Sequence, residues 1–309
     1  MNILVTGGAG FIGSHVVDDL ICDGHNVLVI DNLSTGNLEN LNPKAKFENL
    51  DITDASLSDL MKAFDPDLIS HFAAQTSVIA STNDPMLDAN SNIIGSLNVF
   101  NSMNNTKCVH FININTGGAL YGNPKYLPVD EVHPINPISP YGLSKWTVEY
   151  YFSILKKPYQ NLKTLRLSNV YGPRQDAFGE AGVISIFSNK MSSNEPVTIF
   201  GDGTQTRDFI FVGDVVEAHK ISISRNESFS VNVSSGKAVS INHLYDLMSG
   251  IVGNSLPPNY ESVRVGDLMH STLSNNKARQ LLGWAPKVAL NDGIKRTYDW
   301  HVEQGYLLE

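Results

Sequence analysis

The sequence lacks the features that mark several protein classes. It has two cysteines, Cys22 and Cys108, and no CxxC pair, so neither a disulfide framework nor a cysteine metal site is expected. No apolar run approaches the ~18 residues of a membrane span, and no basic-then-apolar leader opens the chain. Acidic residues outnumber basic ones by 31 to 22, and the net charge of −9 argues against a protein that coats nucleic acid. We therefore expect a cytoplasmic protein with no membrane, nucleic-acid or metal partner, in which both cysteines are small core residues.

A glycine-rich turn is the most informative stretch of the chain. It follows the apolar run 3–5 and precedes an amphipathic helical pattern, and its Gly8, Gly10 and Gly13 match the spacing GxGxxG. Glycine lets the backbone approach a ligand closely, and the N-terminus of the following helix offers amides to a pyrophosphate. A second buried strand then ends in Asp31. This order is the βαβ fingerprint of dinucleotide binding, and the 309 residues suffice for one large or two modest α/β domains.

Acidic residues follow two of the predicted strands. Asp31 stands where a carboxylate hydrogen-bonds the adenosine ribose, and its charge would repel a 2′-phosphate, so we expect NAD rather than NADP. Asp51 follows the strand predicted at 47–50 and has two interpretations of equal weight: a ligand contact, or the cap of a helix predicted over 57–64.

His71 ends the strand predicted at 67–72, which runs into small residues that allow close approach of a cofactor. We interpret His71 as a hydrogen-bonded core residue. No second histidine or carboxylate is spaced for metal or relay chemistry.

A second stretch of candidate functional residues begins at the strand predicted over 109–112, and Thr116 lies at the carboxyl end of that strand. Five prolines between residues 124 and 140 exclude a regular element there and indicate an ordered loop. Ser139 fits an N-cap and Pro140 the first helical position.

Tyr141 and Lys145 therefore fall on one helix face, four residues apart. An ammonium beside the phenol would help to lower a tyrosine pKa that is ordinarily about 10. Together with the glycine-rich turn, this pair predicts acid–base chemistry coupled to a bound dinucleotide.

Seven motifs carry a resemblance to a known family. They are TGGAGFIG at 6–13, DNLSTG at 31–36, HFAAQ at 71–75, Tyr141 with Lys145, RLSNVYGPR at 166–174, GDGTQTRDF at 201–209 and RVGD at 264–267. Over nearly its whole length the sequence resembles the extended short-chain dehydrogenase/reductases, and within them the nucleotide-sugar 4-epimerases of the UDP-glucose 4-epimerase type.

The resemblance implies a doubly wound parallel α/β sheet of the Rossmann type, with a smaller C-terminal α/β domain for the substrate. The expected domains are 1–168, which binds NAD, and 169–309, which mainly binds a UDP-sugar and returns some segments to the sheet. The implied NAD-binding residues are Gly7, Gly10, Phe11, Ile12, Gly13, Asp31, Asn32, Leu33, Ser34, Thr35, Gly36, Asp51, Ile52, Phe72, Ala73, Ala74, Gln75, Asn92, Tyr141 and Lys145.

The resemblance also implies 4-epimerisation of a UDP-hexose through a 4-keto intermediate. Tyr141 would remove the proton of the sugar 4-hydroxyl, Lys145 would hold the tyrosine pKa down, and Thr116 would hydrogen-bond the 4-oxygen. The small side chain of Ser271 would admit N-acetylhexosamines. The implied substrate-binding residues are Thr116, Asn169, Val183, Arg207, Arg264, Asp267 and Ser271, in which arginine forks suit a diphosphate.

Three alternatives remain beside this interpretation: a sugar-nucleotide 4,6-dehydratase, a UDP-glucuronate decarboxylase or 4-epimerase, and a non-catalytic NAD-binding regulator. Dehydratases and decarboxylases of this family carry acids after the threonine, where this chain has Gly117, Gly118 and Ala119. Gly117 also stands where many relatives have a serine or threonine. Tyr141 and Lys145 count against the regulator.

Relatives usually form dimers through two helices. One is the helix that starts near Tyr141, and the other is a helix expected from about Pro85 to Met103, which carries Asn92. An apolar set on the first helix could serve a homodimer: Tyr150, Tyr151, Ile154 and Leu155.

Overall fold

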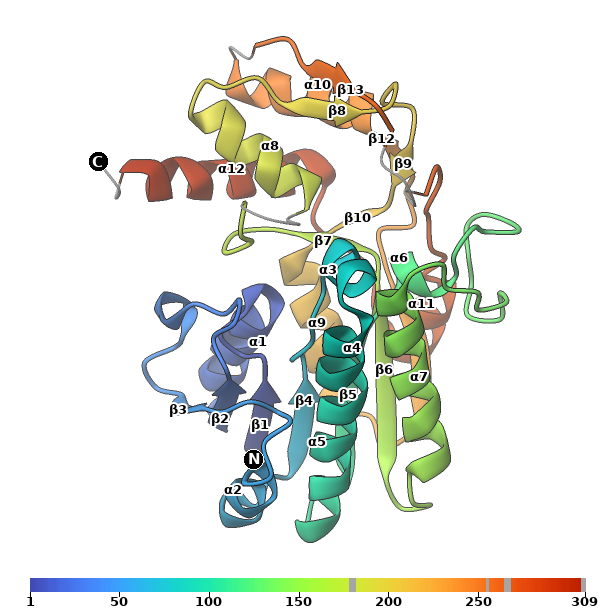
Figure 1. Ribbon diagram of the computed structural model, residues 1–309. Helices are drawn as coiled ribbons and strands as arrows, with labels where there is room; N and C mark the ends of the chain where they lie inside the picture. Colours follow the sequence, from blue (N-terminus) through green and yellow to red (C-terminus); the bar gives the residue numbers. More distant parts are fainter. Residues whose placement is uncertain (178–181, 254–255, 264–267, 307–309) are drawn as a thin grey trace. The chain divides into compact units, whose positions relative to one another are not determined.

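The computed structural model describes residues 1–177, 182–253, 256–263 and 268–306 (Figure 1). The chain forms two compact units. The first consists of Met1–Leu120, Pro137–Arg166 and Val216–Val231, and the second of Tyr121–Asn136, Leu167–Val215 and Asn232–Glu309. Each unit is thus assembled from three separate stretches of the chain.

A seven-stranded sheet forms the centre of the first unit, in the order β11-β6-β5-β4-β1-β2-β3. β1 pairs in parallel with both β2 and β4, and the order reverses between β1 and β4, so a ligand crevice is expected at their carboxyl ends. The strands are β1 (Asn2–Thr6), β2 (Asn26–Asp31), β3 (Lys46–Asn49), β4 (Leu68–His71), β5 (His110–Thr116), β6 (Asn161–Leu167) and β11 (Phe229–Val233). The doubly wound parallel fold is confirmed, and β11, from the C-terminal part of the chain, lies in the sheet.

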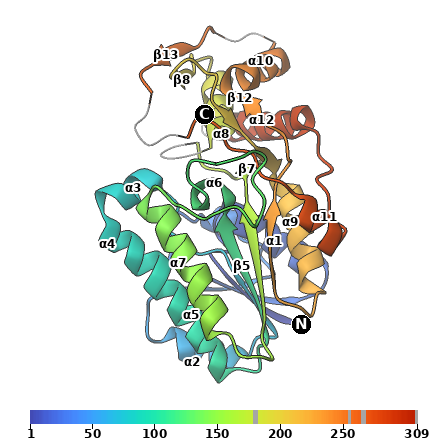
Figure 2. The same cartoon turned by 90° about the vertical axis from the view of Figure 1, so that its right-hand side faces the viewer.

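Helices cover both faces of this sheet, which is why its strands are nearly continuous buried apolar runs. Figure 2 shows α2, α5 and α7 on one face and α1 and α9 on the other. The helices are α1 (Phe11–Cys22), α2 (Leu57–Phe64), α3 (Val78–Asn83), α4 (Pro85–Asp88), α5 (Ser96–Ser102), α6 (Gly117–Leu120), α7 (Pro140–Leu155) and α9 (Val212–Ile223), with 3₁₀ turns η1 (Leu38–Asn40) and η3 (Met103–Asn105).

The helix expected from Pro85 to Met103 is not uniform. Its middle part, η2 (Ala89–Gly95), is a π-helical segment between α4 and α5. Asn92 lies in this segment with its side chain buried and bonded to the backbone of Gln75. π-helical turns of this kind are frequent at functional sites.

The described part of the second unit contains three small two-stranded sheets and four helices. The sheets pair β7 (Asn169–Tyr171) with β10 (Phe209–Phe211), β8 (Thr198–Phe200) with β13 (Asn259–Glu261), and β9 (Thr206–Arg207) with β12 (Val239–Ser240). The helices are α8 (Val183–Ser192), α10 (Ile241–Val252), α11 (Asn276–Leu282) and α12 (Leu290–Tyr306), of which α8, α10 and α12 pack together. The proline-rich loop joins this unit because Val129 bonds the backbone at Thr272 and Ser274.

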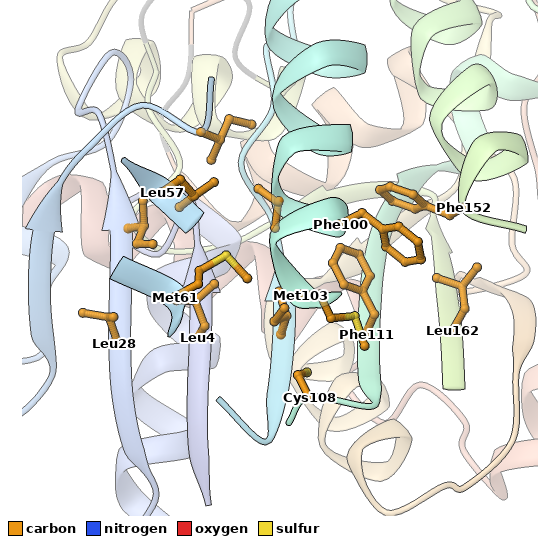
Figure 3. Packing of buried hydrophobic residues seen from close by; sticks show 14 of the residues in the cluster. Leu4, Leu28, Leu57, Met61, Phe100, Met103, Cys108, Phe111, Phe152 and Leu162 are labelled. Carbon is orange, nitrogen blue, oxygen red and sulfur yellow. The ribbon is translucent and has the colours of Figure 1, made fainter. Parts of the chain in front are cut away.

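The core of the first unit lies between the sheet and the α2, α5 and α7 layer (Figure 3). Phe100 stacks on Phe152 with ring centroids 4.5 Å apart, and Phe111 meets both rings edge-on. Cys108 belongs to this cluster, as predicted for a core cysteine. The same prediction for Cys22 is wrong: this thiol is exposed, because the buried stripe of α1 follows helical spacing through Val16, Val17 and Leu20 and leaves Cys22 off it.

His71 and His219 are two of the buried, hydrogen-bonded histidines, and the prediction made for His71 is confirmed. Its ring nitrogens lie 2.7 Å from Thr6 Oγ1 and 2.8 Å from Ser96 Oγ. His219 Nε2 lies 2.8 Å from Ser70 Oγ. Burial lowers the pKa of each imidazole to about 3, assisted by the positive charge of a lysine nearby.

These histidines make the fold sensitive to acid. An unfolded histidine has a pKa of about 6.5, so below that pH the unfolded chain binds protons that the folded chain does not. The free energy of unfolding should fall by about 2 kcal/mol for each histidine between pH 7 and pH 5. Urea unfolding at both pH values should show a smaller loss for His219→Gln, whereas a variant of the exposed His243, His243→Gln, should keep the wild-type loss. Equal losses in wild type and His219→Gln would contradict this account.

Candidate active site

The turn between β1 and α1 forms a tight cradle at the reversal point of the sheet. Gly7 has φ +71°, and a Cβ there would lie 2.6 Å from the amide nitrogen of Ala73, which follows β4. A Cβ on Gly13 would overlap the Gly7 carbonyl oxygen. Gly10 is the N-cap of α1, and no side chain caps that helix end. The first amides of α1, including those of Phe11 and Ile12, therefore suit an anionic group, and the cradle fits the pyrophosphate of a dinucleotide.

Asp31 is fixed at the carboxyl end of β2. Its Oδ2 accepts a bond from the amide of Ala9 (3.0 Å), and its Oδ1 accepts one from the amide of Leu33 (2.9 Å). A Cβ on Gly36 would lie 2.8 Å from Oδ1, so the 32–36 loop folds tightly around the carboxylate. An ionised carboxylate can accept about four hydrogen bonds, so Asp31 retains capacity for two ribose hydroxyls.

Asp51 organises its own loop rather than a helix. Its carboxylate accepts bonds from the amide and hydroxyl of Thr53 and from the side chain of Asn32. α2 begins at Leu57, with Ser56 as its N-cap, so the alternative in which Asp51 caps that helix is wrong. The neighbouring Ile52 is buried in the hydrophobic cluster.

The chain after β4 is tied to α7 through Asn92. The Asn92 side chain accepts a bond from the Gln75 amide and donates to the Gln75 carbonyl, both at 2.9 Å, and it also donates to Ser144 of α7 at 3.2 Å. The Ala73 amide donates to Thr6 Oγ1. The segment Phe72–Gln75, with Ala74 within it, is thus held against β1 on one side and against α7 on the other.

The structure brings Thr116, Tyr141 and Lys145 together. The Ser139 hydroxyl caps α7 by accepting the Gly142 amide, as predicted, and this cap orients the first turn that carries Tyr141. The Thr116 side chain hydrogen-bonds the Tyr141 phenol, and its oxygen also accepts the Ala119 amide at 3.2 Å. Lys145 is buried one turn further along the helix.

Burial dominates the electrostatics of this group. It raises the pKa of Tyr141 to about 12, although the bond from Thr116 acts in the opposite direction. It lowers the pKa of Lys145 to about 8, against the opposing charges of Glu149 and Asp88. Lys145 Nζ donates to the Ile114 carbonyl at 2.9 Å. Burial therefore outweighs the hydrogen bond from Thr116, and the pKa of Tyr141 lies above its ordinary value of about 10.

A buried ion pair includes Glu149, one helical turn after Lys145, and was not predicted from the sequence. Arg166 of β6 meets Glu149 of α7 with Nη2 and Oε1 2.6 Å apart, and both side chains are almost fully buried. Asn115 of β5 donates to Glu149 Oε2 (2.6 Å) and to the Lys145 carbonyl (3.2 Å). A glutamate one helical turn after Lys145 was the available signal, because residues four apart share a helix face.

Besides Thr116, six substrate residues were predicted, and the structure describes four of them. Arg207 lies in β9, where its Nη1 donates to the carbonyls of Thr206 and Leu268, and the Ser271 amide donates to Thr206 as well. The backbone amide of the exposed Asn169 donates to the carbonyl of Asp208, the residue after Arg207. Val183 begins α8. The remaining two, Arg264 and Asp267, lie outside the described residues.

The described part of the chain contains no group of three or more histidine, cysteine, aspartate or glutamate side chains arranged to hold a metal ion. Within the same residues, no helix combines the length and apolar character that crossing a membrane requires.

The fold and the cradle define an α/β protein of the Rossmann type with a dinucleotide site and a Tyr–Lys pair. The chain belongs to the NAD dependent epimerase/dehydratase family, whose model matches residues 3–234. It is 40% identical over 307 residues to the UDP-glucose 4-epimerase of Mycolicibacterium smegmatis, covering 97% of this chain and 98% of that protein.

Two solved structures are similar along the whole chain. The Thermotoga maritima UDP-glucose 4-epimerase with UDP-glucose has a TM-score of 0.96 and 43% identity, with 100% of both chains covered. The Thermus thermophilus UDP-glucose 4-epimerase complex with NAD has a TM-score of 0.92 and 38% identity, with 97% of this chain and 99% of that chain covered.

The cradle predicts that Gly13 tolerates no side chain. Gly13→Ala should weaken NAD binding and destabilise the fold by about 1–3 kcal/mol, because the new methyl group meets the Gly7 backbone. Gly250→Ala in α10 is the matched control, since nothing lies within 4 Å of its added Cβ. Calorimetric titration with NAD and thermal unfolding measure both effects. Wild-type NAD affinity in Gly13→Ala would refute the assignment of this turn as the pyrophosphate cradle.

Proposed function

We propose that the protein interconverts UDP-glucose and UDP-galactose by NAD-dependent epimerisation at C4 of the sugar. The observation that carries this proposal is the hydrogen-bonded pair Thr116–Tyr141 with the buried Lys145 one helical turn after Tyr141, in the unit whose glycine cradle fits a dinucleotide. Membership of the NAD dependent epimerase/dehydratase family and the similarity to UDP-glucose 4-epimerases support it.

Each residue of the trio has a distinct role in the proposal. Tyr141 takes the proton of the sugar 4-hydroxyl and later returns it, and Thr116 orients the same oxygen through a hydrogen bond. NAD, when bound, supplies the hydride chemistry at C4 that passes through a 4-keto sugar, together with a positive charge that favours the phenolate. Lys145 keeps an ammonium near the tyrosine and the cofactor ribose, while Glu149 and Asp88 favour its charged form.

We assign the cofactor contacts as they follow from the sequence and the cradle. Backbone amides of the β1–α1 turn hold the pyrophosphate, and Asp31 holds the adenosine ribose and selects NAD over NADP. The other contacts come from the loops after β2, β3 and β4 and from α7. They are Gly7, Gly10, Phe11, Ile12, Gly13, Asn32, Leu33, Ser34, Thr35, Gly36, Asp51, Ile52, Phe72, Ala73, Ala74, Gln75, Asn92, Tyr141 and Lys145.

The substrate assignment rests on arginine forks and on the three residues that follow Thr116, none of which is acidic. Arg207 and Arg264 suit the diphosphate, with Asn169, Val183, Asp267 and Ser271 completing the UDP-sugar pocket. Gly117, Gly118 and Ala119 provide no carboxylate for elimination or decarboxylation, which favours simple epimerisation over either alternative. The small Ser271 leaves room for an N-acetyl group on the sugar.

The experiment is incubation of purified protein with UDP-galactose, first without and then with added NAD, followed by chromatography of the sugar nucleotides. Appearance of UDP-glucose is expected, and UDP-N-acetylglucosamine offered next should also be converted. No conversion of any of these, with turnover of UDP-glucuronate or dTDP-glucose instead, would overturn the proposed reaction.

Tyr141→Phe is the sharpest single substitution. It should lower kcat by about 10²–10⁴-fold, because the phenol is the proposed acid–base group. NAD affinity and thermal stability should stay near wild type, since the ring remains and only the bond to Thr116 is lost. Steady-state kinetics with a parallel NAD titration measures this, and near-normal turnover in the folded variant would contradict the mechanism.

We further propose a homodimer that forms in the cytoplasm through α7 and its neighbour. α7 exposes Tyr150, Tyr151, Ile154 and Leu155 by 44–64%, and the adjoining α4–η2 segment, which packs on α7, exposes Met86, Leu87 and Ile94 by 51–78%. Apolar residues gathered on neighbouring helices support a protein interface. The free thiols of Cys22 and Cys108 fit a reducing compartment.

Ile154→Glu should shift the protein from dimer to monomer, because it places a charge in the proposed apolar interface. Analytical ultracentrifugation measures the mass. Tyr260→Ser, at a site 56% exposed in the second unit, should leave the dimer intact. A wild-type protein that sediments as a monomer, or an unchanged dimer of Ile154→Glu, would contradict this interface.

A further inference from the structure

Asp208 is a buried carboxylate in the short link between β9 and β10. The residue is 0% exposed, and its oxygens accept five hydrogen bonds. Oδ1 accepts from the Ser235 amide (2.9 Å), the Ser235 hydroxyl (2.6 Å) and the Ser168 hydroxyl (3.3 Å). Oδ2 accepts from the amides of Gly236 (3.2 Å) and Leu273 (3.1 Å). All five donors are neutral.

Burying a carboxylate among neutral donors costs free energy, so the positions of its donors indicate which segments it holds. A buried carboxylate usually has a cationic partner, and without one its charge must be stabilised by hydrogen bonds alone. An amide side chain has one acceptor oxygen and a donating nitrogen, so it could not accept all five bonds. The Asp208 carboxylate accepts bonds from three separate segments, namely residue 168, residues 235–236 and residue 273.

Two of those three segments carry a predicted substrate residue, and the segment of Asp208 itself carries a third. Asn169 directly follows Ser168, and its amide donates to the Asp208 carbonyl at 2.9 Å. Ser271 lies two residues before Leu273, and its amide donates to the Thr206 carbonyl at 3.2 Å. Arg207 directly precedes Asp208. The carboxylate thus bonds the Ser168 hydroxyl beside Asn169 and the Leu273 amide near Ser271, and it belongs to the residue after Arg207.

We propose that Asp208 is a positioning residue of the UDP-sugar pocket, which holds the segments of Asn169, Arg207 and Ser271 in their binding arrangement before the nucleotide arrives. This inference rests on the proposed sugar-nucleotide binding. A pocket whose loops are already ordered loses less conformational entropy when a ligand binds. Asp208 touches no substrate in this account, because it is enclosed by protein, and it acts through the residues around it.

The test compares Asp208→Asn with Asp214→Asn. Asp214 is the matched control: it is a buried carboxylate of the same unit, its Oδ1 and Oδ2 accept the amides of Lys287 and Val288, and no predicted substrate residue lies there. Calorimetry with UDP and with NAD gives both affinities, and steady-state kinetics with UDP-galactose gives kcat and KM. Thermal unfolding reports the stability of each variant.

Asp208→Asn should raise the Kd for UDP and the KM for UDP-galactose about 10-fold or more, with kcat within about threefold and NAD affinity unchanged. Asp214→Asn should lower the melting temperature and leave the UDP affinity at its wild-type value. Unchanged UDP affinity in folded Asp208→Asn, or equal weakening in both variants, would overturn the proposal.

Ser235→Ala decides the question if Asp208→Asn does not fold, because it removes only the shortest of the five bonds. A UDP Kd raised about threefold or more supports the positioning role, and an unchanged Kd overturns it. A wild type that binds UDP without epimerising UDP-galactose would refute the proposed reaction, while the UDP titrations would still test Asp208.

Discussion

The close approach of the β1–α1 turn to the chain after β4 is the constraint on which the cofactor side of this protein depends. Gly7 fits because it has no Cβ that would meet Ala73. Gly13 fits because it has no Cβ that would meet the Gly7 carbonyl where α1 passes it. β1 and β4 are parallel neighbours, so the segments that follow them lie at the same edge of the sheet. Asp31, at the end of the neighbouring strand, accepts a hydrogen bond from the Ala9 amide of the turn. The proposed cofactor site therefore depends on backbone packing at one point of the sheet.

Burial sets the second constraint, at the proposed acid–base group. Tyr141 and Lys145 lie in an environment that favours their neutral forms, which raises one pKa and lowers the other. The proposed chemistry needs the opposite for the tyrosine. A positive charge brought by the cofactor would have a large effect on Tyr141, because charges interact strongly where water is excluded. The proposal therefore couples cofactor binding to the ionisation of the tyrosine.

Local patterns predicted much of this structure, and contacts between distant residues account for most of the rest. The glycine-rich turn, the Ser139 cap and the helical spacing of Tyr141 and Lys145 depend on neighbours in sequence, and each is found where expected. The Glu149–Arg166 pair joins a helix to a strand: the helical spacing of Glu149 after Lys145 is visible in the sequence, but its partner on the strand is not. The exposure of Cys22 depends on where the α1 stripe meets the sheet. Likewise, the donors of Asp208 come from residues 168, 235, 236 and 273, so its role appears only in three dimensions.

The most direct test of the central claim follows the hydrogen at C4 of the sugar. UDP-galactose deuterated at C4 is incubated with the protein, and the UDP-glucose formed is examined by mass spectrometry and NMR. The deuterium should remain at C4 with inverted configuration, and unlabelled substrate in heavy water should gain no label there. Loss of the label to solvent would contradict hydride transfer at C4 and with it the proposed role of the bound dinucleotide.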